Sequence, residues 1–453
     1  MTRTIILRGG HVTDPSQGLD DVRDVLIESG RISAIDSDLP GEGKAEVIDA
    51  MGLMVSPGLV DLHAHLREPG REDEETIESG SLSAASGGIT SILAMPNTDP
   101  PTDNPAAVGF ILKQAALAGL AKVYPVGAVT EDLKGETMSP IGEMVDAGAV
   151  ALSDDGMPVV NSEIMRRVLE YTKIFAIPVI DHCEDPNLTI DGVMNEGLLA
   201  TRMGLKGMPP AAEEIMVARD VLLAKLTGGR LHIAHVSTGK SAEIIRRAKE
   251  EGVNVTAEVT PHHLSLTEEA VRGYNTNAKV NPPLRTHDDV VALREALAYG
   301  TIDCIATDHA PHHYDEKEKE FNYAPFGLIG FETALAVGVT FLVREGILTL
   351  SQLIDRMSNR PASIMGIEGG TMRIGAVADV IIFDPELRWV VDEAKLHSRS
   401  SNTPYRGMEL VGKNMMTILN GNIIWESDVM KNRRKKGVGE LRKKSLDKKG
   451  YKL

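Results

Sequence analysis

The sequence predicts a barrel of eight β-strands alternating with α-helices, a TIM (β/α)8 barrel in the α/β class, with a small β-domain built from both chain ends. Eight strand-like runs alternate with helical patterns through the middle of the 453-residue chain, and both ends are rich in short β-type segments. Such a barrel needs about 250 residues, which leaves room for a smaller partner. A doubly wound open sheet is the alternative, but no glycine-rich dinucleotide fingerprint follows the first strand.

Both chain ends carry the β-domain pattern. Strand-like runs separated by Gly and Asp turns open the chain as in a small antiparallel unit, at Thr4–Leu7, Val25–Glu28 and Arg31–Ile35. Similar runs return near the other end, at Ala378–Phe383, Trp389–Val391 and Met416–Leu419, with a hairpin turn at Asn420-Gly421-Asn422. We expect residues 1–55 and 369–430 to form the β-domain and 56–368 the barrel. The basic residues 431–453 are expected to be a disordered tail.

The barrel strands are expected where apolar runs stop at polar residues. These runs are Leu59–Leu66, Ile89–Met95, Lys122–Val129, Ala149–Asp155, Pro178–Cys183, Arg230–Val236, Asn254–Thr260 and Asp303–Asp308. Helical segments lie between most of them, for example Asn161–Lys173, Ala211–Leu226 and Lys240–Glu250. Because barrel active sites lie at the C-terminal ends of the strands, polar residues there are the functional candidates.

Charge and cysteine content limit the classes of protein. The formal net charge is −17, but residues 431–453 carry +9, which leaves −26 on residues 1–430. An acidic body argues against nucleic-acid binding by the main fold. Two cysteines, Cys183 and Cys304, are too few for a disulfide scaffold and fit a reducing, cytoplasmic setting. No apolar run approaches the roughly 20 residues that span a bilayer, so we expect no membrane association. The charged run Asp315–Glu320 is interpreted as a solvated loop.

The first barrel run carries two histidines on one face. It reads Asp61-Leu-His-Ala-His-Leu-Arg67, and alternation places Asp61, His63, His65 and Arg67 together. Two imidazoles one step apart on the inner face of a barrel can bind one metal ion. Alone, this pattern is a modest signal, because polar residues inside a barrel also pair by hydrogen bonds.

Other strand ends add candidate ligands. The fifth run ends in His182 and the eighth in Asp308. His232 and His235 on the sixth run face opposite sides, and His235 is the better ligand because it is nearer the C-terminal end. His232 is expected to be structural.

The fourth run ends in Asp154 and Asp155, which also point opposite ways, so one of them is a candidate ligand. Together, four His and two Asp at strand ends predict a metal site. Nitrogen and oxygen ligands suit zinc with an open position for water. Candidates for supporting these ligands by hydrogen bonds are His262, His263 and His309.

At these motifs the chain resembles the dihydroorotases, cyclic-amide hydrolases of the amidohydrolase superfamily. The main matching stretches are Asp61-Leu-His-Ala-His-Leu-Arg-Glu-Pro69 and Ala306-Thr-Asp-His-Ala-Pro-His312. Supporting stretches are Met95-Pro-Asn-Thr98, Asp181-His-Cys-Glu184, Asn281-Pro-Pro-Leu-Arg285 and Pro325-Phe-Gly327. The resemblance covers about residues 1–425 and not the basic tail. It implies reversible zinc-dependent cyclisation of N-carbamoyl-L-aspartate to L-dihydroorotate in de novo pyrimidine (UMP) biosynthesis. It leaves open a homodimer and an association with aspartate transcarbamoylase.

The resemblance also implies residue roles. Two zinc ions per subunit would be held by His63, His65 and Asp308 and by His182 and His235, with Asp155 rather than Asp154 bridging them. Many relatives bridge with a carboxylated lysine on the fourth strand, and this chain has none there. That absence disfavours the alternative, a hydantoinase-like or allantoinase-like amidohydrolase.

Asp308 would be the catalytic proton shuttle, and the substrate would be bound by Arg67, Asn97, Asn281, His312, Phe326 and Gly327. A guanidinium suits the substrate carboxylate because it forms paired hydrogen bonds. The alternative for Arg67 is an ion pair with Glu68 or another nearby acid. A third hypothesis, an inactive barrel serving as a scaffold for aspartate transcarbamoylase, is disfavoured because all candidate ligands are present.

Overall fold

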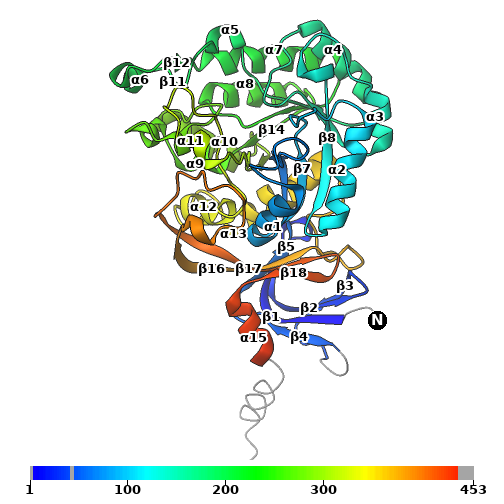
Figure 1. The fold of residues 1–453 in the computed structure, drawn as a ribbon. Coiled ribbons are helices and arrows are strands. Elements are labelled where there is room, and N and C mark those ends of the chain that lie inside the picture. The colour runs from blue at the N-terminus through cyan, green and yellow to red at the C-terminus, as the bar shows by residue number, and fades with distance from the viewer. Residues whose placement is uncertain (1–3, 41–44, 437–453) are drawn as a thin grey trace, which may run out of the picture.

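The computed structural model describes residues 4–40 and 45–436, and it contains a barrel standing on a β-rich domain (Figure 1). The barrel strands are β6 (Leu59–Ala64), β7 (Ile89–Ala94), β8 (Lys122–Ala128), β9 (Ala151–Ser153), β10 (Val179–Asp181), β13 (Leu231–Ile233), β14 (Val255–Val259) and β15 (Cys304–Ile305). They pair in chain order, and each neighbouring pair is parallel. A parallel bridge between Ala64 and His309 joins the last strand region to the first. This confirms the predicted TIM barrel.

Helices cover the outside of the barrel. The main ones are α1 (Ile77–Gly87), α2 (Pro105–Ala118), α3 (Ile141–Ala147), α4 (Ser162–Tyr171), α7 (Ala211–Thr227), α8 (Gly239–Glu250) and α10 (His287–Tyr299). Several begin where a side-chain oxygen accepts from a backbone N–H, as Thr76, Asn104 and Thr238 do. Apolar side chains from strands and helices form one large core between the two layers. Helix α4 matches its expected segment closely.

The two ends of the chain meet in one sheet, as predicted. Its strands are β1 (Thr4–Asp14), β2 (Leu19–Glu28), β3 (Arg31–Asp36), β4 (Glu46–Asp49), β5 (Met54–Pro57), β16 (Val380–Val390), β17 (Glu409–Leu419) and β18 (Asn422–Glu426). Strand β5 pairs with β16, which joins the two chain ends. The turn between β17 and β18 has Asn420 and Gly421 at φ 50° and 73°, the left-handed values that a tight hairpin needs.

Two details differ from the sequence-based expectation. The N-terminal unit is not purely antiparallel, because β4 and β5, two four-residue strands that the sequence did not reveal, pair with β1 in parallel. The boundary at residue 431 falls inside helix α15 (Asp428–Lys436). Met430 is buried in the core of the β-domain, and Arg434 pairs with Glu426 at 3.2 Å. The rest of the expected tail lies outside the described residues.

No helix in the described part of the chain is both long and apolar enough to cross a bilayer.

Candidate metal and substrate site at the barrel mouth

The predicted metal ligands gather at the C-terminal ends of the barrel strands. We call this set the floor of the site: His63, His65, Asp155, His182, His235 and Asp308. The elements that carry them are β6 and the segments that follow β6, β9, β10, β13 and β15. All of these side chains are buried. The barrel thus brings residues from distant parts of the sequence into one cluster, as parallel strand ends do.

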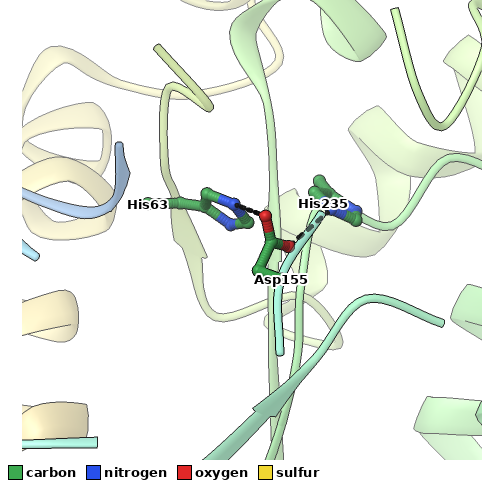
Figure 2. Close-up of side chains that lie close together, drawn as sticks. All are labelled: His63, Asp155 and His235. Carbon is green, nitrogen blue, oxygen red and sulfur yellow. Dashed lines mark ion pairs between the residues drawn. The ribbon is translucent and has the colours of Figure 1, made fainter. Parts of the chain in front are cut away.

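Asp155 lies at the centre of the floor. Its Oδ2 is 3.2 Å from His63 Nε2 and its Oδ1 is 3.4 Å from His235 Nε2 (Figure 2). Asp154 points elsewhere, where its carboxylate accepts from the N–H and hydroxyl of Thr130. Burial raises the pKa of Asp154 to about 6, although Thr130 opposes that shift. Of the two adjacent aspartates, only Asp155 reaches the histidine cluster.

The floor has the spacing and chemistry of a metal centre. In each of two groups, His63 with Asp155 and His235, and His63 with His65 and Asp308, the potential ligand atoms lie within 4.8 Å of one another. His63 Nε2 and Asp155 Oδ1 are buried and make no hydrogen bond with the described residues. Buried polar atoms are normally paired, so these two are suited to an ion. Imidazole nitrogens and carboxylate oxygens are ligands that zinc accepts.

Hydrogen bonds from behind orient the histidines. His63 Nδ1 lies 2.7 Å from Glu258 Oε1, and His65 Nδ1 lies 2.8 Å from Asn97 Oδ1. A proton on each Nδ1 serves these acceptors and leaves the Nε2 lone pair facing the floor. Glu258 was missed by sequence reasoning. Its signal was a lone acid in the otherwise apolar end of β14.

His182 faces the floor with Nδ1, whereas His63 and His65 face it with Nε2. Its Nδ1 is 2.9 Å from His235 Nε2 and 3.6 Å from Asp155 Oδ1. Its Nε2 lies 3.3 Å from Asn281 Nδ2, at the edge of the substrate pocket. His182 therefore joins the floor to the pocket.

The histidines keep the floor carboxylates ionised. Burial alone would raise the pKa of Asp155 and Asp308, but hydrogen bonds and charges from the surrounding histidines hold both below their ordinary range. Burial would lower the pKa of His63, yet Asp155 and Glu258 raise it. The two carboxylates are thus available to bind a cation or accept a proton.

Three residues of the site other than glycine have positive φ angles, Arg67 at 62°, His235 at 30° and Asp308 at 49°. Such values are unfavourable for residues other than glycine and collect at functional sites. All three lie just beyond a barrel strand, where the backbone bends away from the strand direction.

A cavity of about 340 Å³ opens above the floor. We call the predicted substrate-binding residues the wall: Arg67, Asn97, Asn281, His312, Phe326 and Gly327. All of them line the cavity together with every floor residue except His63, which lies beneath. The volume fits a single small ring compound. Asn281 Oδ1 is buried without a hydrogen-bond partner among the described residues, so it can accept from a ligand N–H.

Arg67 forms an ion pair, which was the alternative role predicted for it, and its partner is Glu74 rather than Glu68. Its Nε lies 3.1 Å from the carboxylate of Glu74, and its NH2 is 3.2 Å from His312 Nε2. Glu68 does not pair with it and instead accepts from the first N–H of α1, on Ile77. The ion pair leaves Arg67 in the cavity lining, so ion pairing and ligand binding coexist.

Two buried lysines hold the loop that carries Phe326 and Gly327. Lys317 Nζ donates to Pro325 O at 2.8 Å and to Gly327 O at 2.9 Å. Lys279 Nζ donates to Ala324 O at 2.7 Å and lies 4.6 Å from the centre of the Phe326 ring. The solvated-loop interpretation of the charged run is therefore wrong for Lys317, which is only 5% exposed and whose amino group donates to the loop carbonyls.

Four other buried histidines lie outside the floor and the wall. His232 bonds Thr256 and Glu258, which agrees with the structural interpretation. His263 Nε2 lies 3.0 Å from Pro282 O, and His309 Nδ1 accepts from Gly330 N. His262 is buried with its Nε2 unpartnered among the described residues.

Comparisons with known proteins agree on one family. The protein-family model described as Dihydro-orotase-like matches residues 52–241. A dihydroorotase from Geobacter metallireducens is 52% identical over 422 residues, 93% of this chain and 99% of that protein. A dihydroorotase from Acetivibrio thermocellus is also 52% identical, over 94% of this chain and 100% of that protein.

Solved structures of related enzymes share the whole fold. An L-hydantoinase (dihydropyrimidinase) from Arthrobacter aurescens has a TM-score of 0.83 at 28% identity, covering 94% of this chain and 96% of that one. A D-hydantoinase from a Bacillus species has a TM-score of 0.81 at 25% identity, covering 93% and 95%.

Proposed function

This chain belongs to the dihydroorotase family, and from that premise we propose that it interconverts L-dihydroorotate and N-carbamoyl-L-aspartate. The observation that carries the proposal is the pairing of a metal-ligand floor with a wall that contains an arginine, across one small cavity. In hydrolysis, water adds to a ring carbonyl and the bond from that carbon to the ring nitrogen breaks. Ring closure is the reverse and releases water. The setting we propose is cytoplasmic pyrimidine biosynthesis.

The floor would hold two divalent ions, which we propose to be zinc. His63, His65 and Asp308 are the ligands proposed for one ion, and His182 and His235 for the other, with Asp155 between them. Bound there, the ions would polarise the ring carbonyl and increase the acidity of water. The unpartnered atoms of His63 and Asp155 support this assignment.

Asp308 is the proposed proton carrier. Its carboxylate lines the cavity, is 3.0 Å from His65 Nε2 and has a pKa held low by the histidines. In hydrolysis it takes a proton from the attacking water and gives it to the departing ring nitrogen. In ring closure the same proton travels in the opposite direction.

The wall would orient the substrate. Arg67 and His312 lie together and suit the carboxylate on the ring, with Asn97 beside them. Asn281 and the backbone around Phe326 and Gly327 would read the amide edges of the ring. This arrangement would present the reacting carbonyl to the floor.

Hydantoin hydrolysis is the second candidate, because the solved structures described above are of hydantoinases. The relatives with far higher identity are dihydroorotases, and the residue at the centre of the floor is Asp155 rather than a lysine.

A substrate panel tests the proposal. Purified protein should turn over L-dihydroorotate and N-carbamoyl-L-aspartate far faster than hydantoin or allantoin, and contain about two zinc ions per chain. Prolonged chelation should abolish turnover, and zinc should restore it. Faster turnover of hydantoin would overturn the substrate assignment, and full activity of metal-free protein would overturn the metal assignment.

A further inference from the structure

Beside the wall lies a buried acid that the proposed reaction does not use. Glu74 is 1% exposed and sits in the loop between β6 and α1. Its Oε2 is 3.1 Å from Arg67 Nε, and its Oε1 is 2.8 Å from His312 Nδ1. Arg71, which is half-exposed, donates to the same Oε1 at 3.0 Å. One carboxylate therefore joins two side chains of the wall that come from opposite ends of the barrel sequence.

The two carboxylate oxygens of Glu74 contact different wall residues. One faces Arg67 and the other faces His312, and both partners line the cavity. His312 Nε2 lies 2.6 Å from Phe326 O and 3.2 Å from Arg67 NH2. A neutral imidazole has one proton, so a proton on Nδ1 that is donated to Glu74 leaves Nε2 to accept from Arg67, whereas a proton on Nε2 would be donated to Phe326 O. At 1% exposure, bulk solvent does not screen either contact.

We propose that Glu74 is a positioning residue that fixes Arg67 and His312 as a preformed clamp for the carboxylate of the substrate. We call Arg67 and His312 the carboxylate clamp. Without Glu74, Arg67 would keep its hydrogen bond from Nε to Pro311 O but lose its buried counter-charge, and His312 could change tautomer and donate its proton to Phe326 O. The substrate would then bear the cost of ordering both groups, which weakens binding without changing the chemistry on the floor. The identity of the ligand rests on the proposed function, whereas the clamp itself rests on the contacts of Glu74.

Glu74→Gln is a sharp probe because it keeps the shape of the side chain. Glutamine has one acceptor oxygen and one NH2 donor, so either orientation sets its NH2 against an N–H of Arg67 or of His312. One arm of the clamp is therefore lost in each orientation. Glu72→Gln is the matched control, since it removes the same charge two residues away from an exposed side chain.

Binding and turnover are measured on the same preparations. Orotate, a planar analogue with the ring and the carboxylate, serves as the calorimetric ligand for the full-length, metal-loaded protein. We expect Glu74→Gln to weaken orotate binding and raise the KM for L-dihydroorotate about tenfold or more, with kcat within about threefold of wild type. Zinc content should stay unchanged, and Glu72→Gln should match wild type throughout.

A double-mutant cycle separates positioning from general folding. In an Arg67→Gln background, Glu74→Gln should weaken orotate binding by less than about threefold, because one of its targets is already gone. Equal effects in both backgrounds, or wild-type orotate affinity in folded Glu74→Gln, would overturn the inference.

A second variant, Glu74→Asp, is measured in case Glu74→Gln does not fold. Glu74→Asp keeps the charge but is one methylene too short to reach both partners, so it should weaken orotate binding in the same direction. Wild-type affinity in that variant would equally overturn the inference. If wild-type protein binds orotate, the Glu74 variants bind it more weakly and no protein turns over dihydroorotate, the proposed function is wrong and the clamp still stands.

Discussion

The floor and the wall of the cavity face each other but are stabilised differently. Floor side chains leave the ends of β-strands, and some of their buried polar atoms have no partner among the described residues. Most wall side chains come from loops and are held by buried ionisable groups of the protein. Glu74 holds Arg67, and Lys279 and Lys317 hold the loop that carries Phe326 and Gly327. The unpartnered floor atoms of His63 and Asp155 are thus open to the cation that we propose, whereas Arg67, His312 and the Phe326 loop of the wall already contact protein groups without a ligand.

This difference separates chemistry from recognition. Substitutions of floor residues should reduce kcat and metal content, because each one removes a proposed metal ligand. Changes on the wall should mainly affect substrate affinity, because its residues act through orientation. Substitutions in the two regions therefore test whether chemistry and substrate recognition are separate.

The largest effect is expected at Asp308. Asp308→Asn keeps the size of the side chain but cannot accept a proton, so turnover in both directions should fall about 10⁴-fold. Steady-state rates and zinc content are measured on one sample. Substantial activity at full metal occupancy would remove Asp308 from the proton-carrier role.

Asp155→Asn should lower turnover about 10³-fold and reduce bound zinc, because the variant loses the charge at the centre of the floor. Asp154→Asn is the neighbouring control. It loses one acceptor for Thr130, which costs about 1–3 kcal/mol of stability, but should retain zinc and turnover. Elemental analysis and thermal melting distinguish the two. Loss of zinc in the Asp154 variant alone would reverse the assignment.

Arg67→Lys should lower kcat/KM about 10²-fold, since lysine keeps the charge but loses the planar pair of donors. The melting temperature should change little, and zinc content should stay at the wild-type level. Normal kcat/KM in this variant would show that Arg67 does not grip the carboxylate of the substrate.

Lys317→Met should raise KM a few-fold, because Pro325 and Gly327 lose the donor that fixes their loop. Burial, with Lys279 and Arg67 nearby, lowers the pKa of Lys317 from 10.5 to about 7. Stability from Lys317 is then fully present above about pH 10 and lost as pH falls through about 7, where charging the buried amine costs free energy. The melting temperature of wild type minus that of the variant should therefore grow from pH 7 to pH 10. Exposed Lys319→Met is the control, and a flat difference would contradict the assignment.

The smallest effect is expected at the C-terminal helix, which supplies neither floor nor wall. Helix α15 packs against β4 and β17 of the β-domain. Truncation after Lys436 should leave turnover and melting temperature unchanged. Truncation after Met430 should lower the melting temperature by about 2 °C through loss of the Arg434 ion pairs, with normal turnover. A large loss of turnover in either soluble truncation would mean that this end of the chain supports the site.

The sequence by itself determined the barrel, the position of its mouth and five of the six floor residues. Alternation along a strand and the rule that barrel sites lie at strand C-terminal ends are local regularities, so His63, His65, His182, His235 and Asp308 could be placed without coordinates. Periodicity could show only that Asp154 and Asp155 point opposite ways. The family resemblance favoured Asp155, and the structure gives the physical reason, because the Asp155 carboxylate lies near His63, His182 and His235 from three other strands.

Only the tertiary structure decided how the wall is braced. Glu74 and His312 are 238 residues apart, and they meet because the barrel closes β15 against β6. Lys317 looked like one charge in a solvated run until the folded loop placed backbone carbonyls around it. Sequence patterns report the direction of a side chain relative to its own strand or helix. The partner that it meets depends on chain closure over hundreds of residues. Floor residues could therefore be predicted from the sequence, whereas Glu74 and Lys317, which support the wall, could not.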